Sequence, residues 1–195
     1  MIPRKLQVIV VLLVLAILAM GSYLIYLKRK AETVSAVPTS RPMTPPVSGP
    51  AQDVVLFIAS DADDAVRPTT VSVAMPTDSS QRARVALHTL VARYQQKDSP
   101  HPLSDSADVH DVYLLDPSSA VVNLNAAFAE THRSGIEVEQ LSILSMVRTL
   151  KAQLPQLARV RFLVEGKSSE SLAGHLDLSQ WIDVSSAIDA CRELN

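Results

Sequence analysis

The stretch that decides the fold runs from Glu137 to Ser179 and reads EVEQLSILSMVRTLKAQLPQLARVRFLVEGKSSESLAGHLDLS. Up to Leu154 its apolar residues recur every three or four positions, the spacing of one face of an amphipathic helix. Pro155 lacks an amide hydrogen and disfavours helix at the residue before it, so this helix should end near Leu154. The period then changes to two, which predicts a strand with a buried face before a turn at Gly166. The residues expected to pack together are Leu144, Val147, Leu150, Val160, Phe162 and Val164.

Upstream of this stretch, the sequence predicts strands and a second long helix. Val54–Ala59 is an apolar run typical of a buried strand, and Thr70–Ala74 alternates like a second one. Asp78 and Gln81 have the spacing of a capping box and predict a helix over Ser79–Gln96.

Two further strand patterns, Val109–Leu115 and Ala120–Leu124, flank an Asp-Pro-Ser-Ser turn and predict a hairpin. Ser134 and Glu137 predict a capping box at the start of the central helix. Gly174–Leu178 reads as an edge strand, and a weak C-terminal helix is expected around Ser185–Leu194. The order of elements predicts an α+β domain, in which two long helices pack on one face of a mostly antiparallel or mixed β-sheet.

The N-terminus is predicted to cross a membrane. Leu6–Leu27 contains 22 residues without a charge, enough at 1.5 Å per residue to cross a hydrocarbon layer of about 30 Å. A cleaved signal peptide usually has a shorter apolar region, and here the apolar run continues to the basic residues Lys28, Arg29 and Lys30. We therefore expect a retained signal anchor within residues 1–30. No cysteine lies nearby, so lipid attachment is not expected.

A tether and one domain are predicted to follow the anchor. Ala31–Gln52 holds five prolines among Thr, Ser, Val and Ala, a composition that favours extended, disordered chain. Residues 53–195 have the size of a single domain and carry a net charge of −7. An acidic domain is a poor partner for nucleic acid. Positive charges are balanced across the span, so charge alone does not orient it.

Several short motifs follow one another in the second half of the domain. They are VVNLN and AAF over residues 121–128, Thr149-Leu150, Leu154-Pro155, a strand ending at Gly166, and Gly174-His175. This pattern is similar to the GerMN domain of the spore germination protein GerM family, and the resemblance covers most of residues 53–178. It implies an envelope protein outside the bacterial cytoplasmic membrane, and a domain with no catalytic residue set.

No motif in the sequence predicts a reaction. Gly166-Lys167-Ser168 resembles the end of a phosphate-binding loop, but Arg161 stands where that loop needs its first glycine, so we interpret the motif as a turn. Ser168, Ser169 and Ser171 lack the flanking glycines of a nucleophile elbow. A triad could still assemble from distant residues, although nothing in the sequence points to one.

Metal and cofactor sites are not predicted either. The histidines lack the helical spacing of zinc ligands, although distant ligands could converge; they are His88, His101, His110, His132 and His175. Asp61, Asp63 and Asp64 could suggest calcium, but the glycine and distal glutamate of an EF-hand are missing, which favours a solvated turn. The lone Cys191 is expected to be buried, and the alternative is a thiol available for an intermolecular bridge. Trp181 and Ile182 either cap the core or contribute to a contact surface.

The leading functional hypothesis is a non-enzymatic, single-pass protein of the bacterial cytoplasmic membrane. Its domain would lie on the periplasmic or extracytoplasmic side and bind an envelope protein or peptidoglycan. The alternative is a cell-wall hydrolase, or a direct activator of one, that uses convergent Asp and His groups. Such an enzyme would need a concave pocket with several titratable groups facing one another. A third hypothesis, a membrane adaptor that faces the cytoplasm, is permitted by the balanced charges.

Overall fold

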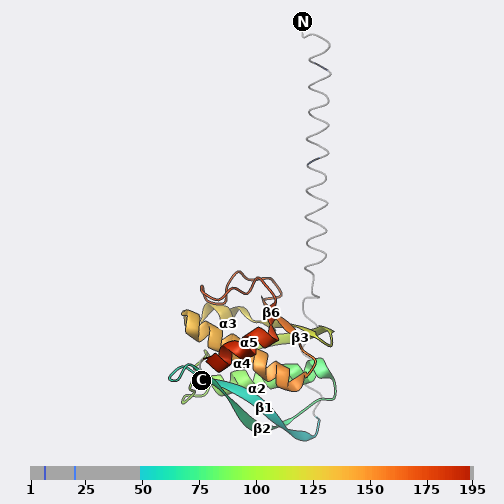
Figure 1. Cartoon of the computed structure of the whole chain (residues 1–195), viewed down its shortest axis with the longest axis vertical. Helices are drawn as coiled ribbons and strands as arrows, with labels where there is room; N and C mark the ends of the chain where they lie inside the picture. The colour runs from blue at the N-terminus through green and yellow to red at the C-terminus, as the bar shows by residue number, and fades with distance from the viewer. Residues whose placement is uncertain (1–6, 8–19, 21–48, 194–195) are drawn as a thin grey trace. The chain divides into compact units, whose positions relative to one another are not determined.

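The computed structural model describes Gln7, Met20 and residues 49–193 (Figure 1). The predicted span Leu6–Leu27 lies outside the described residues apart from Gln7 and Met20, as does the tether Ala31–Gln52 up to residue 48. Among the residues that are described, no helix is long and apolar enough to cross a membrane. The elements are β1 (Ala51–Ser60), β2 (Ala65–Ala74), α2 (Ser79–Tyr94), β3 (Val109–Asp116), β4 (Ser119–Leu124), α3 (Ala126–Glu130), α4 (Ile136–Gln153), β5 (Arg159–Val164), β6 (Ile182–Asp183) and α5 (Val184–Glu193).

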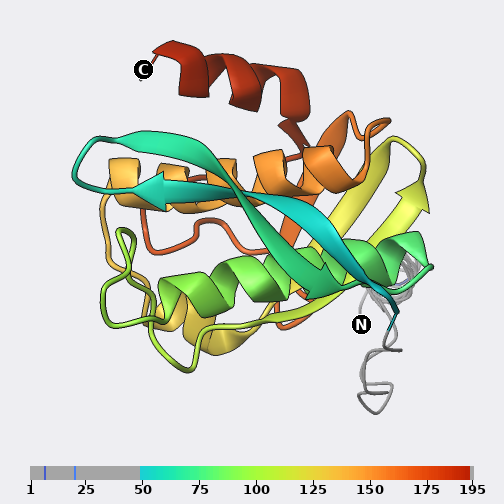
Figure 2. The same ribbon diagram turned by 90° about the horizontal axis from the view of Figure 1, so that it is seen from below.

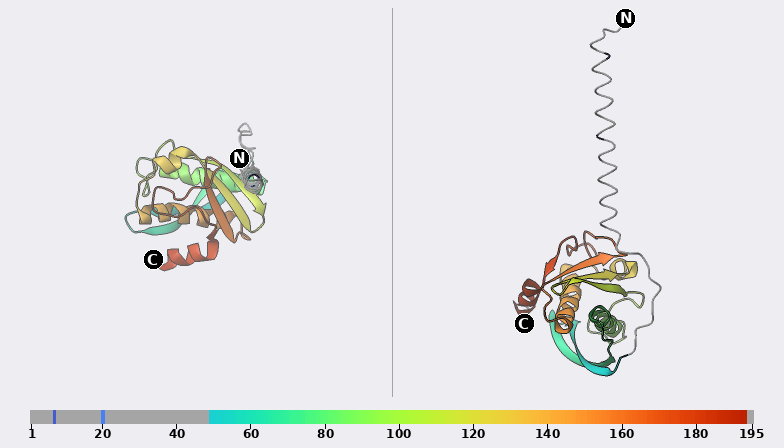
Figure 3. Two further views of the ribbon diagram at one scale, coloured as in Figure 1. Left: turned by 90° about the horizontal axis from the view of Figure 1, so that it is seen from above. Right: turned by 90° about the vertical axis from the view of Figure 1, so that its right-hand side faces the viewer.

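The domain has two sheets with a layer of helices between them. One sheet has the strand order β3-β4-β5-β6, and the other is the two-stranded ribbon β1-β2. Helices α2 and α4 pack against each other, and the ribbon covers the side of the helices away from the larger sheet (Figure 3, right). The α+β class and the mixed sheet are confirmed. The prediction of one sheet with two helices does not include the separate β1-β2 ribbon, which forms a third layer.

Strand pairing in the larger sheet follows the sequence patterns. β3 and β4 form the predicted antiparallel hairpin, with register shifts on either side of its centre. β4 and β5 run parallel, because the chain crosses over through α4 between them. β6 pairs with β5 through only two residues. The predicted strand at Gly174–Leu178 is wrong, since this segment makes a single bridge between Ser171 and Asp177.

The N-terminal ribbon was only half visible in the sequence. β1 and β2 pair antiparallel in one unbroken register from Ala51 opposite Ala74 to Ser60 opposite Ala65. The sequence pattern predicts most of β1, as Val54–Ala59, but only the second half of β2, as Thr70–Ala74. The first half of β2 is missing from the prediction because Arg67-Pro68 interrupts its β pattern. β1 also begins two residues before the predicted domain boundary at Asp53.

The two long helices begin differently. The Asp78 side chain accepts a hydrogen bond from Gln81 N at 2.9 Å, so the cap predicted for α2 is confirmed. The cap predicted from Ser134 and Glu137 is wrong, because α4 begins after Gly135, which has no side chain to cap it. Ser134 instead directs its hydroxyl toward Ala173 O, where it donates at 3.2 Å.

Helix α4 is buried on almost every side, since it lies between the two sheets (Figure 2). Of the six residues predicted to pack together, five are buried and Val164 is half-buried. Phe128 and Leu157 also belong to this core. The side of α4 that faces the ribbon carries polar residues, and these build the candidate site.

Candidate functional site

Three buried hydroxyl groups follow one face of α4. Ser142, Ser145 and Thr149 are spaced by three and four residues, which places them in a row along the helix. Each is at most 1% exposed. Thr149 Oγ1 accepts a hydrogen bond from Phe57 N at 3.0 Å, so the row meets strand β1. A buried hydroxyl needs a partner, and the partners of Ser142 are two histidines.

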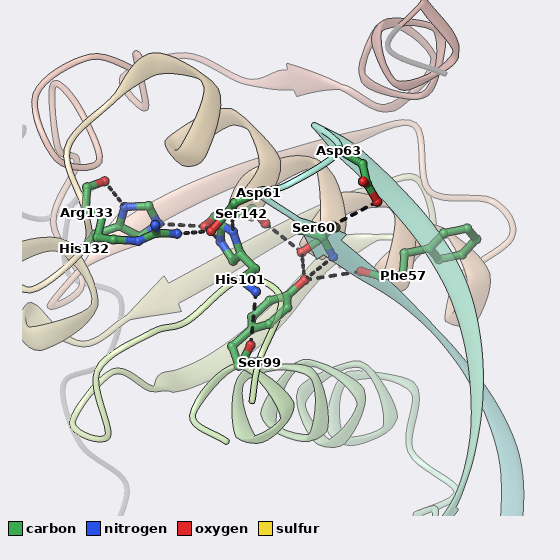
Figure 4. Close-up of polar contacts among 12 residues, drawn as sticks. Phe57, Ser60, Asp61, Asp63, Ser99, His101, His132, Arg133 and Ser142 are labelled. Atoms are coloured by element: carbon green, nitrogen blue, oxygen red, sulfur yellow. Dashed lines mark hydrogen bonds and ion pairs between the residues drawn. The ribbon is translucent and has the colours of Figure 1, made fainter. Parts of the chain in front are cut away.

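The Ser142 hydroxyl lies between the rings of His101 and His132 (Figure 4). Its Oγ is 2.6 Å from His101 Nε2 and 2.7 Å from His132 Nε2. His101 comes from the loop after α2 and His132 from the loop between α3 and α4. His132 also stacks on Phe128, with ring centroids 5.9 Å apart. Both imidazoles are buried.

An aspartate and an arginine extend the cluster toward the surface. Asp61 follows β1, and its Oδ1 is 2.5 Å from His101 Nδ1. Its Oδ2 accepts a hydrogen bond from the half-exposed Arg133 guanidinium. The backbone sets this geometry, because Asp61 N donates to Pro100 O at 3.0 Å and so holds the loop of His101 against the end of β1.

Tyr94 joins the cluster to the ribbon. Its hydroxyl accepts from Ala59 N and donates to Ser145 Oγ, both at 2.8 Å, while Ser145 Oγ donates to Ser142 O at 3.0 Å. Burial raises the pKa of Tyr94 to about 12. The phenol therefore stays protonated and acts as a fixed connector between α2, α4 and β1.

The partners of the two histidines determine where their hydrogens lie. His132 Nδ1 donates to Arg133 O, which is only an acceptor, and His101 Nδ1 donates to the Asp61 carboxylate. Both Nε2 atoms of the neutral rings are then acceptors, yet the Ser142 hydroxyl has one hydrogen to donate. Burial lowers the pKa of His101, against the hydrogen bond and charge of Asp61, and burial also lowers the pKa of His132. The neutral cluster therefore lacks one hydrogen for its full set of bonds.

A second buried group, Glu139, organises the loop after β5. Its carboxylate accepts from four backbone amides, those of Gly135, Ala173, His175 and Leu176, at 2.9 to 3.2 Å. It also contacts His175 Nδ1 at 3.0 Å. Burial alone would raise the pKa of Glu139, but the hydrogen bonds, led by that from Leu176 N, lower it to about 2. Gly174 has φ +115°, a conformation that favours glycine and lets the amides on both sides turn toward the carboxylate.

The three aspartates considered for calcium do not converge on one point. Asp61 faces His101 and Arg133, while Asp63 pairs with Arg67 at 2.6 Å. Asp64 ends the turn with φ 49° and lines a pocket beside Glu137 and Gln140. In the described part of the chain, no group of three or more His, Cys, Asp or Glu side chains is placed to hold a metal ion.

The remaining residues singled out in the sequence lie apart from the cluster. His88 contacts Asp108 at 2.8 Å, and His110 contacts Glu165 at 3.2 Å. His175 lies in a loop and not at the end of a strand.

Gly166-Lys167-Ser168 is a turn, as predicted, closed by hydrogen bonds between Val164 and Lys167 in both directions. In the polar loop that follows, Ser168 Oγ accepts from Arg161 Nη2, and Ser169 Oγ donates to Ser171 O. Trp181 and Ile182 are half-buried, with the Arg159 guanidinium 4.7 Å from the Trp181 ring centroid. The side chain of Cys191 lies outside the described residues.

Asp61 contacts His101 and His101 contacts Ser142, as in the Asp-His-Ser triad of a hydrolase, but the surroundings of these residues oppose acyl transfer. A nucleophilic serine must reach a substrate carbonyl, and donors must stabilise the resulting oxyanion. Ser142 is 1% exposed and sits within a helix, with a second imidazole on its oxygen. A pocket lined by Asp64, Glu137, Gln140 and Leu141 includes no residue of the cluster and has a volume of about 50 Å³. Ligand pockets are usually about 300–1,000 Å³.

Comparison with known proteins identifies the family. A family model described as Germane, sporulation and spore germination, matches residues 55–170. The chain belongs to this family. The Germane match runs from β1 into the loop after β5, so it contains the whole Ser142 cluster. A comparison with curated proteins found no match.

Two solved structures are similar to this chain at low sequence identity. The tandem GerMN domains of the sporulation protein GerM from Bacillus subtilis are 15% identical, with a TM-score of 0.53. The match covers 70% of this chain and 48% of the tandem structure. A candidate lipoprotein from Clostridium perfringens is 19% identical over 73% of this chain and 93% of its own, with a TM-score of 0.47. The GerM likeness supports the fold.

Proposed function

We propose that this Germane protein is a non-enzymatic envelope protein whose domain binds another envelope protein or peptidoglycan. Leu6–Leu27 would anchor it in the bacterial cytoplasmic membrane, and Ala31–Gln52 would hold the domain away from the bilayer on the periplasmic or extracytoplasmic side. The predicted span supports the membrane anchor.

The observation that carries the non-enzymatic assignment is the enclosure of the Ser142 cluster. Its members contact one another across four separate segments, and Tyr94 and Thr149 join the same helix to β1. Buried polar networks of this kind specify one packing arrangement, because a shifted helix would leave their groups unpaired. The cluster thus holds the ribbon and helices in register, which a binding domain requires of its surface.

The second candidate function, a cell-wall hydrolase or its activator, is favoured by one observation. The distances of 2.5 Å from Asp61 to His101 and 2.6 Å from His101 to Ser142 are within reach for proton transfer. A hydrolase would have to open the domain to expose Ser142, because the hydroxyl is enclosed in this structure.

Incubation of the purified full chain with peptidoglycan tests both functions. We expect no soluble muropeptides above those from heat-unfolded protein. Their release, lost in Ser142→Ala and retained in Ser145→Ala, would establish the hydrolase and overturn the proposal. Ser145 is the matched control because it is an equally buried serine of α4 that does not contact a histidine. Co-sedimentation with the same peptidoglycan then separates a glycan partner from a protein partner.

A further inference from the structure

The two outer edges of the β1-β2 ribbon differ in whether their backbone groups have hydrogen-bond partners. On the β1 edge, Phe57 N donates to Thr149 and Ala59 N donates to Tyr94. Alternate residues of an antiparallel pair point their backbone groups inward and outward. Leu56 and Ile58 therefore make the ladder bonds to β2, and the β1 edge is closed by side chains from the helices.

The register identifies the backbone groups on the outer edge of β2. Residues opposite Val55 and Phe57 point outward, so Thr70 and Pro68 belong to this set, with Ser72 and Ala74 further along. Val66 O accepts from Arg148 at 3.0 Å, and Pro68 has no amide hydrogen. This leaves Thr70, Ser72 and Ala74, whose outward N–H and C=O groups have no partner among the described residues and whose side chains are exposed.

This open edge lacks the usual protection against strand pairing. Natural sheets defend free edges with charges, prolines and bulges. One edge strand of the other sheet, β3, has two register shifts and carries Asp111 and Asp116. β2 has no register shift, and residues 68–77 contain no charge. Pro68 protects only the part of β2 near the turn.

We propose that this edge pairs antiparallel with β2 of a second copy of the chain, about a two-fold axis at Ser72. Thr70 of each copy then lies opposite Ala74 of the other, and the three open residues form about six main-chain hydrogen bonds. A centre nearer the turn would place Pro68 in the ladder. The uncharged segment of residues 68–77 on both sides brings no like charges together, and the half-buried Val71 and Val73 face each other across the pair.

A four-stranded sheet made from two ribbons follows. A two-stranded ribbon is marginal alone and is stabilised by packing against a helix or by further strands. Here the helices cover one face of the ribbon, and the pairing would add two strands at its open edge. This pairing of two copies goes beyond the proposed function, because it does not depend on the side of the membrane on which the domain lies. It is tested on purified protein, so its failure leaves the location and the absence of catalysis to their own tests.

Cysteine cross-linking of the full chain in detergent tests the pairing. In a Cys191→Ser background, Ser72→Cys places two thiols at paired positions, where Cα atoms lie about 5.5 Å apart and a disulfide fits. We expect a disulfide-linked dimer at least tenfold more abundant than for the control Leu115→Cys. Leu115 is 63% exposed and lies on β3, the edge strand with register shifts and aspartates. Adding Thr70→Pro should abolish the dimer without lowering Tm, because the Thr70 amide makes no bond to β1.

Equal cross-linking at both cysteines would show random encounter and overturn the proposal. Absence of the dimer at Ser72→Cys, with both variants folded by circular dichroism, would overturn it as well. A Ser72→Cys adduct in cells that contains only a different protein would assign the edge to another strand and exclude the second copy.

Discussion

Replacing Glu139 with glutamine removes one negative charge from a buried carboxylate that accepts four backbone hydrogen bonds, while keeping its size. The native pKa of about 2, against an ordinary value of 4.5, measures how strongly the fold favours the charged form. Each pKa unit corresponds to about 1.4 kcal/mol, so the charge contributes about 3 kcal/mol of stability at neutral pH. The glutamine side chain could accept through only one oxygen, and its NH₂ group would face Gly135 N. We expect Glu139→Gln to lower the free energy of unfolding by about 2–4 kcal/mol.

The pH dependence gives this prediction a second readout. A carboxyl whose folded pKa is lowered stabilises the fold above its unfolded pKa, and this stability is lost as the pH falls through the folded value. The wild-type chain should therefore lose stability between about pH 4.5 and pH 2, and Glu139→Gln should show a shallower slope there. Urea unfolding followed by the fluorescence of Trp181 measures both quantities. The control is Glu137→Gln, the same change at an exposed position two residues earlier, which should stay within about 0.5 kcal/mol. A loss below about 1 kcal/mol for Glu139→Gln, or an unchanged acid slope, would refute the role assigned to the carboxylate.

Three further predictions concern the core, the histidines and the tether. Leu150→Ala should cost about 2–5 kcal/mol in urea unfolding because Leu150 is fully buried, and a loss below about 1 kcal/mol would contradict its place in the core. Burial lowers the pKa of His101 and His132 in the folded chain, so the unfolded chain binds more protons as the pH falls below 6.5. Tm should therefore drop between pH 7.5 and pH 5.5, and a constant Tm would contradict this. Scrambling residues 31–48 of the tether, which stops short of β1, at constant proline content should preserve function in cells. Deleting about fifteen of these residues, on the order of 45 Å of reach, should abolish it. Loss on scrambling alone would show that the linker is itself recognised.

The local elements were predictable from the sequence because their signals are local. The stripe of α4 and the alternation of β5 place Leu150 and Phe162 in the core, and Asp78 caps α2 as its spacing predicts. The strand expected at Gly174–Leu178 failed because the backbone amides of this segment bind Glu139 instead of a neighbouring strand. A side chain 34 or more residues away decided its conformation, and no periodicity records such a bond.

The candidate site could not be predicted for the same reason. Its bonds join Asp61 to His101 and His101 to Ser142 across 40 and 41 residues. One signal was present, the row of Ser142, Ser145 and Thr149 at helical spacing beside the apolar stripe of α4. A row of small hydroxyl side chains beside the apolar stripe of a helix indicates a wider buried face and hence a second layer, and here that layer is the β1-β2 ribbon.

The proposed envelope function requires the domain to lie outside the cytoplasmic membrane. A reporter fused after Asn195 tests this directly, with alkaline phosphatase, which is active only outside the cytoplasm, compared with a fluorescent protein that matures only inside. The account predicts phosphatase activity and a dark fluorescent fusion at equal expression. A fluorescent fusion with inactive phosphatase would place the domain in the cytoplasm and contradict the proposed envelope function.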